Sequence, residues 1–413
     1  MHTSEDQNIS YLLSLQAVRD RSRLVLKAAG EGALDNFDYH YERMPEVADF
    51  VLGVISTKAR IWPYRFAEIP PHGRWQHFDV GGVDRITPLL KKWESEGCDA
   101  TERTRRLIDL FFVSVLLDAG AGDVWNFKEP TTGKTHGRSE GIAVASPLHV
   151  HGWRFQCWSN RTPRGRLRSL LSDLFREPYD RSFFSGQTPQ QRGVLATLFA
   201  QYIRSNGPTR QPCLSSKEPQ VLDYEVFWSA LQNVLIPSWP KDRTHVRGKP
   251  IGDAWPLQVL ADRNQGDKEI GAIQPFHKLT QWLGIPLPYH SFGCSASGSS
   301  TGSWYRNGGL FVDLGVLQLK PAVLEQGRKA SGQDLPSYSA TGDVIVEWRA
   351  MTVALLDELY KLISAHFAEK GVQFSMAQML EAGTWKGGRE LAAKHRPETR
   401  SSPILMDGDG TLF

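Results

Sequence analysis

With 413 residues, the chain is long enough for two or three ordinary domains or for one large composite domain. Hydrophobic residues make up 40% and charged residues 23%, which is typical of a globular protein, and a net charge of +3 gives no general argument for binding nucleic acid or a membrane. The four cysteines lie far apart, which excludes a zinc ribbon or a disulfide framework and favours a reducing compartment: Cys98, Cys157, Cys213 and Cys294. No apolar run approaches the roughly 20 residues that span a bilayer, so we expect no membrane partner and a cytoplasmic or nuclear location.

Three helices are expected in the first hundred residues. The first covers Ile9–Ala29, where leucines and valines recur at helical spacing before Gly30 and Gly32. Pro45 favours a helix that begins near Glu46, because proline fits the first turn. A third helix is predicted from Val83 to Glu94.

A buried helix followed by a polar loop dominates the stretch 107–146. Apolar residues at helical spacing begin at Leu107, and Gly120 and Gly122 then end the helix. The loop contains Asp123, Trp125, Arg138 and Glu140. A rigid helix that presents such a loop is a common way to build a functional site.

The segment 147–216 differs in composition from the rest of the chain. It holds ten arginines and no lysine against three acidic residues, a net charge of +7. One interpretation is a nucleic-acid-binding insert, because clustered arginine with aromatic residues suits phosphates and bases. The other is a misread segment, from a frame error or a retained intron. In either case, its apolar residues lack a period, and we expect it to be poorly ordered.

The C-terminal half is again mostly helical. Its longest helix is predicted over about Val344–Ala368, a further helix starts at Ser375 and breaks at Gly387-Gly388, and a short strand is expected around Leu310–Val312. The fold class is therefore mainly α: a multi-helix globular fold with a few short strands and two helical lobes that form a cleft. The expected domains are an N-terminal lobe (9–146), the atypical arginine-rich segment (147–220) and a C-terminal lobe (221–413).

Two strings resemble known motifs without their context. TTGKT at 131–135 lacks the first glycine of a phosphate-binding loop, since position 128 is Lys128. ILMDGDGTLF carries Asp407 and Asp409 at the end of the chain, with no domain behind them, and is interpreted as a surface tail or edge strand. No metal-like spacing is present beyond one histidine pair in a loop, so neither a metal nor a cofactor is predicted.

Five clusters place polar side chains beside glycine or tryptophan. Glycine lets a ligand approach the backbone, tryptophan gives a flat apolar wall, and arginine or lysine binds an anion. Together they predict a site for a small polar ligand with an anionic group. The binding residues expected are Arg85, Trp125, Arg138, Arg306, Asn307, Trp385 and Lys386.

Long strings of the chain resemble a family of fungal and bacterial uracil-catabolism proteins long carried as a domain of unknown function. They include RWQHFDVGGVDR, LIDLFFVSVLLDAGAGDVWNFKEP, YRNGGLFVDLGVL and LEAGTWKGGRE. The resemblance covers about 12–146 and 224–413, and none is seen between 147 and about 220. It implies a step in the breakdown of a pyrimidine-derived, ribose-phosphate-bearing compound, in a pathway that opens the ring and releases urea.

On this basis the chain is predicted to hydrolyse the N-glycosidic bond of a ribosylurea-like phosphate. Asp123 or Glu140, with Asp313 as third choice, would stabilise the ribosyl cation, and Arg138 would face Arg306 or Lys386 across the cleft. The alternative is a non-catalytic partner protein of a uracil-degradation enzyme, because no catalytic triad, metal cage or cofactor fingerprint is present.

Overall fold

The computed structural model describes residues 4–59, 69, 74–99, 126–152, 243–263, 267–284 and 304–407, with scattered positions at 103–115 and 228–236. For a few of these residues, Arg138 among them, only the backbone is described. The arginine-rich segment falls outside the described residues beyond position 152, so its expected disorder stays a prediction. None of the described helices is long and apolar enough to cross a membrane.

The chain forms two compact units that alternate along the sequence. Unit 1 contains residues 1–72, 244–277 and 295–408, and unit 2 contains 73–243, 278–294 and 409–413. The first 72 residues therefore belong with the C-terminal part of the chain, whereas the sequence predicts two consecutive lobes.

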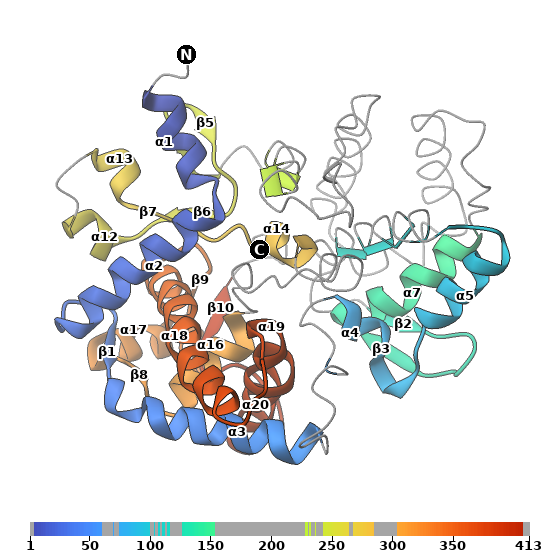
Figure 1. Ribbon diagram of the computed structural model, residues 1–413. Coiled ribbons are helices and arrows are strands. Elements are labelled where there is room, and N and C mark those ends of the chain that lie inside the picture. The colour runs from blue at the N-terminus through green and yellow to red at the C-terminus, as the bar shows by residue number, and fades with distance from the viewer. Residues whose placement is uncertain are drawn as a thin grey trace. The chain divides into compact units, whose positions relative to one another are not determined.

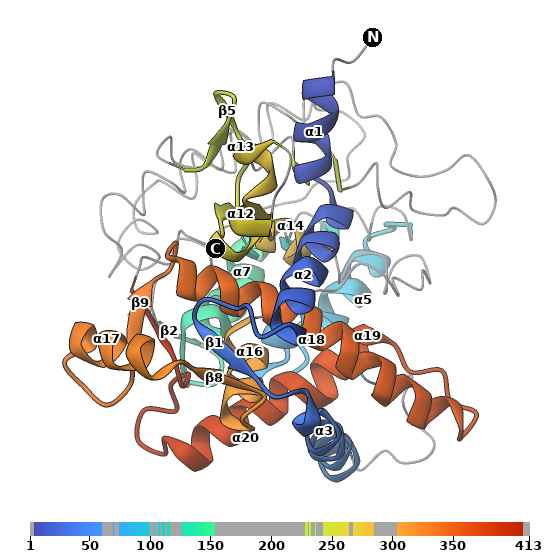
Figure 2. The ribbon, with the colours of Figure 1, turned by 90° about the vertical axis from the view of Figure 1, so that its left-hand side faces the viewer.

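Helix α18 (Asp343–Ala368) is the centre of unit 1. Trp348, Met351, Leu355 and Leu359 on this helix are at most 1% exposed, and α2 lies against it in both views (Figure 1, Figure 2). A helix buried on most of its surface needs partners on several sides. They are α2 (Leu15–Gly30), α3 (Met44–Ala59) and α16 (Trp304–Asp313).

Shorter elements complete unit 1. Its other helices are α1 (Ser4–Leu12), η1 (Tyr41–Arg43), α12 (Gln258–Arg263), α13 (Lys268–Gly271), α17 (Pro321–Ser331), α19 (Met376–Met379), the π-helical turn η5 (Leu380–Thr384) and α20 (Trp385–His395). Its strands are β1 (Phe37–Tyr39), β4 (His245–Val246), β5 (Lys249–Pro250), β6 (Ala254–Pro256), β7 (Ile273–Pro275), β8 (Leu317–Leu319), β9 (Ser337–Ser339) and β10 (Leu405–Asp407). These strands form two-stranded pairs only, antiparallel for β1–β8, β4–β5 and β6–β7 and parallel for β9–β10.

The predicted first helix is two helices, because Ser14 begins the second one. The Ser14 hydroxyl accepts a hydrogen bond from the backbone N–H of Ala17, the usual contact of an N-cap serine. The predicted helix at Val83 likewise begins later, as α5 (Thr87–Ser95), where Asp84 accepts hydrogen bonds from the N–H groups of Ile86 and Thr87. The predictions of helices near Glu46 and over Val344–Ala368 are confirmed.

Two predictions based on glycine are wrong. The expected strand at Leu310–Val312 lies within α16, and the expected break at Gly387-Gly388 lies within α20. In both helices glycine serves close packing. A Cβ added at Gly388 would lie 2.1 Å from the Arg306 carbonyl oxygen, and one added at Gly308 would lie 2.7 Å from the Thr352 hydroxyl.

Unit 2 is built on a small aromatic core. Its described elements are α4 (Trp75–Phe78), η3 (Val80–Gly82), α5, β2 (Asn126–Lys128), β3 (Thr135–Gly137), α7 (Arg138–Gly152) and α14 (Lys278–Gly284). Strands β2 and β3 form an antiparallel pair whose turn contains the TTGKT string. Phe78, Trp93 and Phe111 share one buried cluster, and Leu107 and Val115, in the helix predicted to begin at Leu107, are also buried.

The tail string ends in the parallel pair of β9 and β10. Asp407 pairs with Ser339 there and is exposed, as expected for an edge strand. Asp409 lies outside the described residues.

Candidate functional site

A π-helical turn in unit 1 carries a buried acidic side chain. Helix α19 starts with a capping box at Ser375, in which the serine hydroxyl and the Gln378 side chain bond each other's backbone N–H. The helix then widens into η5, whose five residues are all buried, before it continues as α20. Such turns are rare and are found frequently at functional sites. This one includes Glu381, 3% exposed, and Thr384, 0% exposed.

The turn packs against α16 and α3. A Cβ added at Gly383, within the turn, would lie 2.7 Å from Val51 of α3, and Gly388, shortly after the turn, lies against the Arg306 carbonyl of α16. The hydroxyl of Thr384 donates to the carbonyl oxygen of Leu380 in the preceding turn of the same helix. The turn is therefore enclosed by two neighbouring helices, which accounts for the burial of its residues.

Lys386 connects this carboxylate to solvent. Its Nζ lies 3.7 Å from Oε1 of Glu381, and the lysine side chain is 37% exposed while the glutamate side chain is 4% exposed. An ammonium group at the edge of a buried carboxylate gives the site one negative and one positive end.

Asn307 adds an amide from α16. The residue is 0% exposed, and neither Oδ1 nor Nδ2 has a hydrogen-bond partner. On α16, Gly308 contacts α18 and Leu310 faces Gly387 of α20. Because each residue of an α-helix is rotated by about 100° from the one before, Asn307 lies between these two faces of α16. We refer to Asn307, Glu381, Thr384 and Lys386 as the α16–η5 site.

The other predicted residues of unit 1 are held by neighbours. Arg396 binds Asp313 with two hydrogen bonds of 2.8 and 2.6 Å, one to each carboxylate oxygen. Arg306 donates to the carbonyl oxygen of Arg400 at 2.9 Å, and the guanidinium of Arg389 lies 4.8 Å from the ring centre of Trp385. Of the sequence candidates in unit 1, Asn307 is buried on α16, Lys386 lies beside Glu381, and Asp313 is anchored by Arg396. Their roles in binding a ligand stay predictions.

In unit 2, Arg85 is enclosed by acceptors. It donates to both carboxylate oxygens of Glu129, at 2.9 and 3.0 Å, and to the carbonyl oxygens of Phe78, Val80 and Val83. These hydrogen bonds from Arg85 are the main reason why the pKa of Glu129 falls to about 2. Arg85 therefore ties the 78–83 segment to the β2–β3 pair.

The remaining predicted residues of unit 2 are only partly described. Glu140 is half-buried in the first turn of α7, where the helix dipole favours a carboxylate. Asp123, Trp125 and the side chain of Arg138 lie outside the described residues. The expected cleft with Arg138 opposite Arg306 or Lys386 joins residues of different units and stays a prediction.

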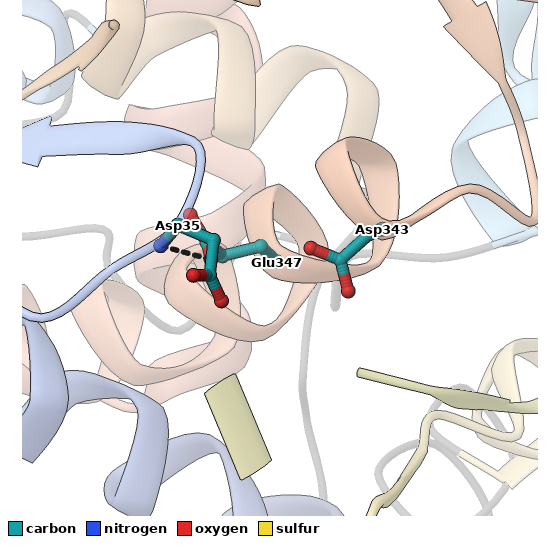
Figure 3. A group of neighbouring side chains, drawn as sticks. All are labelled: Asp35, Asp343 and Glu347. Atoms are coloured by element: carbon teal, nitrogen blue, oxygen red, sulfur yellow. Dashed lines mark hydrogen bonds between the residues drawn. The ribbon is translucent and has the colours of Figure 1, made fainter. Parts of the chain in front are cut away.

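A second group of carboxylates lies elsewhere in unit 1, where Asp35, Asp343 and Glu347 bring oxygens within 4.8 Å of one another (Figure 3). Three carboxylates are ligands suited to a hard cation, which requires six or more oxygens. The oxygens of Glu347 accept the backbone N–H groups of Asp35 and Asn36, and those of Asp343 accept Nδ2 of Asn36 and the backbone N–H of Gln258. These hydrogen bonds give the three carboxylates a structural role, because they link three segments of the chain. Burial raises the pKa of Glu347 to about 7.

The sequence analysis does not single out Glu381 and Thr384, although both lie in the string LEAGTWKGGRE that carries the family resemblance. They fall inside the helix predicted from Ser375, where a polar residue is normally solvent-exposed. The sequence has no local signal for the π-helical turn that buries them.

The fold and this site define the chain as a mainly helical protein with a buried polar group at a π-helical turn. It belongs to the family described as "Protein of unknown function (DUF1688)", which matches residues 11–166 and 164–413. The two ranges overlap at 164–166 and together cover the arginine-rich segment, so the prediction that the family resemblance is absent between 147 and about 220 is wrong.

Two relatives are similar over almost their whole length. "Protein urg3" of Schizosaccharomyces pombe is 41% identical over 428 residues, which cover 98% of this chain and 99% of the relative. "Uracil catabolism protein 4" of Lachancea kluyveri is 34% identical over 442 residues, 99% of each chain.

Proposed function

We propose that the protein acts in uracil catabolism and hydrolyses the N-glycosidic bond of a ribosylurea-like phosphate. The support for the pathway is the full-length similarity to the relative named for uracil catabolism. The support for a hydrolytic site is the buried carboxylate of Glu381 beside Lys386.

In this reaction the bond between the anomeric carbon and a urea nitrogen breaks. Water adds its oxygen to that carbon, and a proton goes to the nitrogen, which gives urea and a ribose phosphate. The transition state resembles an oxocarbenium ion, so a carboxylate fixed near the sugar lowers its energy. The Glu381 side chain is only 4% exposed, and low exposure to solvent strengthens such an interaction; a preorganised group of this kind contributes roughly 3–4 kcal/mol.

The observation that carries the proposal is the ion pair of Glu381 and Lys386. The side chain of Glu381 is 4% exposed, and that of Lys386 is 37% exposed. The carboxylate would stabilise the cationic sugar, and the exposed lysine would bind the anionic phosphate. Glu140 and Asp123 of unit 2 stay the candidates from sequence for the carboxylate role.

The test is release of urea from synthetic ribosylurea phosphate by the purified full-length protein. We expect Glu381→Gln to lower kcat by about 10²–10³-fold and Glu325→Gln, an exposed glutamate on α17, to leave it unchanged. Asp123→Asn and Glu140→Gln are measured in parallel. Absence of urea release above the level without protein would disprove the hydrolase.

The alternative, a non-catalytic partner of another enzyme in the pathway, requires a large exposed apolar surface. Among the described residues, the large apolar side chains exposed by 39% or more are four that lie far apart in the sequence: Leu24, Tyr41, Val83 and Leu362. This scatter favours the enzyme.

A further inference from the structure

The amide of Asn307 is a buried polar group that the fold does not use. Both of its hydrogen-bonding atoms lack partners, although the residue is 0% exposed. Burying an amide without hydrogen bonds is destabilising, so most buried side-chain amides in proteins are bonded. A ligand that forms hydrogen bonds with the amide of Asn307 would account for its burial without partners in the protein.

The position of Asn307 fits that use. The residue lies on α16 between the faces that meet α18 and α20, and α16 also packs against η5, the turn that contains Glu381 and Thr384. Lys386 gives this region a solvent-exposed end. The amide therefore belongs to a helix that packs against the turn carrying this carboxylate.

We propose that Asn307 recognises a carbonyl oxygen and a neighbouring N–H on one edge of the ligand. A primary amide offers an acceptor and a donor side by side, and the O=C–N–H edge is its complement. A ureido group and the closed uracil ring both carry this edge. The inference rests on the proposed function, because it assigns the nitrogen-containing part of that substrate to Asn307 and the sugar to Glu381.

Ser402 provides a matched control. It is 5% exposed, and its Oγ also lacks a partner. Its hydroxyl would lie 3.5 Å from a Cβ at Gly309, which is about 200° around α16 from Asn307. Ser402 thus shares the burial and the missing hydrogen bond of Asn307 but lies on another side of α16.

The experiment measures binding by calorimetry with two probes, uracil for the closed ring and ribosylurea phosphate for the ureido group. Asn307→Leu removes donor and acceptor, and Asn307→Asp keeps an acceptor but loses the donor. We expect both variants to weaken binding of the recognised probe by about 10- to 100-fold, and Ser402→Ala to leave it within twofold. The probe that binds shows whether Asn307 recognises the closed uracil ring or the ureido group.

Thermal unfolding separates recognition from a structural role. Asn307→Leu removes an unbonded amide and keeps the side-chain size, so its melting temperature should equal or exceed that of the wild type. The inference is overturned if neither probe binds the wild type, if both Asn307 variants bind like the wild type, or if Asn307→Leu melts well below it.

The outcomes also separate this inference from the proposed hydrolysis. Urea release with an unchanged KM in both Asn307 variants would reject the recognition role and keep the hydrolase. Probe binding that depends on Asn307, without urea release by the wild type, would reject the hydrolase and keep the recognition role.

Discussion

Arg85 and Glu129 show how a residue suited to binding an anion can be used entirely within the protein. The two side chains are 9% and 5% exposed, and the arginine donates to both oxygens of the glutamate. In the sequence, the planar guanidinium of Arg85 beside glycines indicates a contact with an anionic ligand. The same planar cation is equally suited to bind a buried carboxylate of the protein.

We predict that Arg85→Leu destabilises unit 2 by about 3–5 kcal/mol, because it leaves a buried carboxylate without its cation. The ion pair also has a pH signature. The pKa of Glu129 is lowered from 4.5 to about 2, so its contribution to stability is complete above pH 4.5 and is lost as the pH falls towards 2. Urea unfolding at pH 7 and pH 3.5 measures both effects. A variant as stable as the wild type at pH 7 would contradict the prediction.

Glu347 has the opposite dependence. Its pKa is raised from 4.5 to about 7, mainly by burial and further by the charges of Asp343 and Asp35. Its folded form therefore binds a proton more strongly, and stability is lost as the pH rises from 4.5 to 7.

Asp35→Asn removes one of these charges from an exposed side chain. We expect the variant to be more stable than the wild type at pH 8, by at most about 1 kcal/mol because solvent screens the exposed charge, and to differ less at pH 4.5. Chemical unfolding at the two pH values tests this. An equal gain in stability at both pH values would show that relief of charge repulsion is not the cause.

At the scale of elements, the helices that could be predicted from the sequence differ from those that could not in their glycine content. The sequence of α18 is a long run with few polar interruptions, so its helical state and burial could be inferred. Gly308 and Gly388 have no side chain to carry periodicity, and local preference alone favours turns there. Their helical state depends on contacts with Trp348, Thr352 and Arg306, which are far away in sequence.

A pair of substitutions tests this use of glycine. Gly388→Ala places a methyl group 2.1 Å from a backbone oxygen of α16, whereas Gly53→Ala, within α3, meets nothing within 4 Å. We expect the first to destabilise unit 1 by more than about 2 kcal/mol and the second to stabilise it by about 0.5–1 kcal/mol. Urea unfolding of both variants gives the comparison, and a neutral Gly388→Ala would mean that the helices are less tightly packed.

At the scale of the whole molecule, the order of elements along the chain does not match their grouping in space. Composition supported two consecutive lobes separated by the arginine-rich segment. The contacts instead group α2 and α3, from the first 60 residues, with α18 and η5. Amphipathic faces show that a helix is buried but not which partner buries it, so this pairing could not be derived from periodicity.

The last prediction concerns folding of unit 1 from fragments. Residues 221–413 alone should not form a cooperatively folded unit, because α18 would expose the surface that α2 and α3 cover, including Trp348 and Leu355. Adding the fragment 1–72 should restore folding, since it supplies both helices. A fragment 1–72 with Val25→Glu should fail, because Val25 on α2 is 0% exposed and a charge there would be buried unpaired. Near-ultraviolet circular dichroism and thermal unfolding would detect the assembly. Cooperative unfolding of 221–413 by itself would instead support a C-terminal lobe that folds independently.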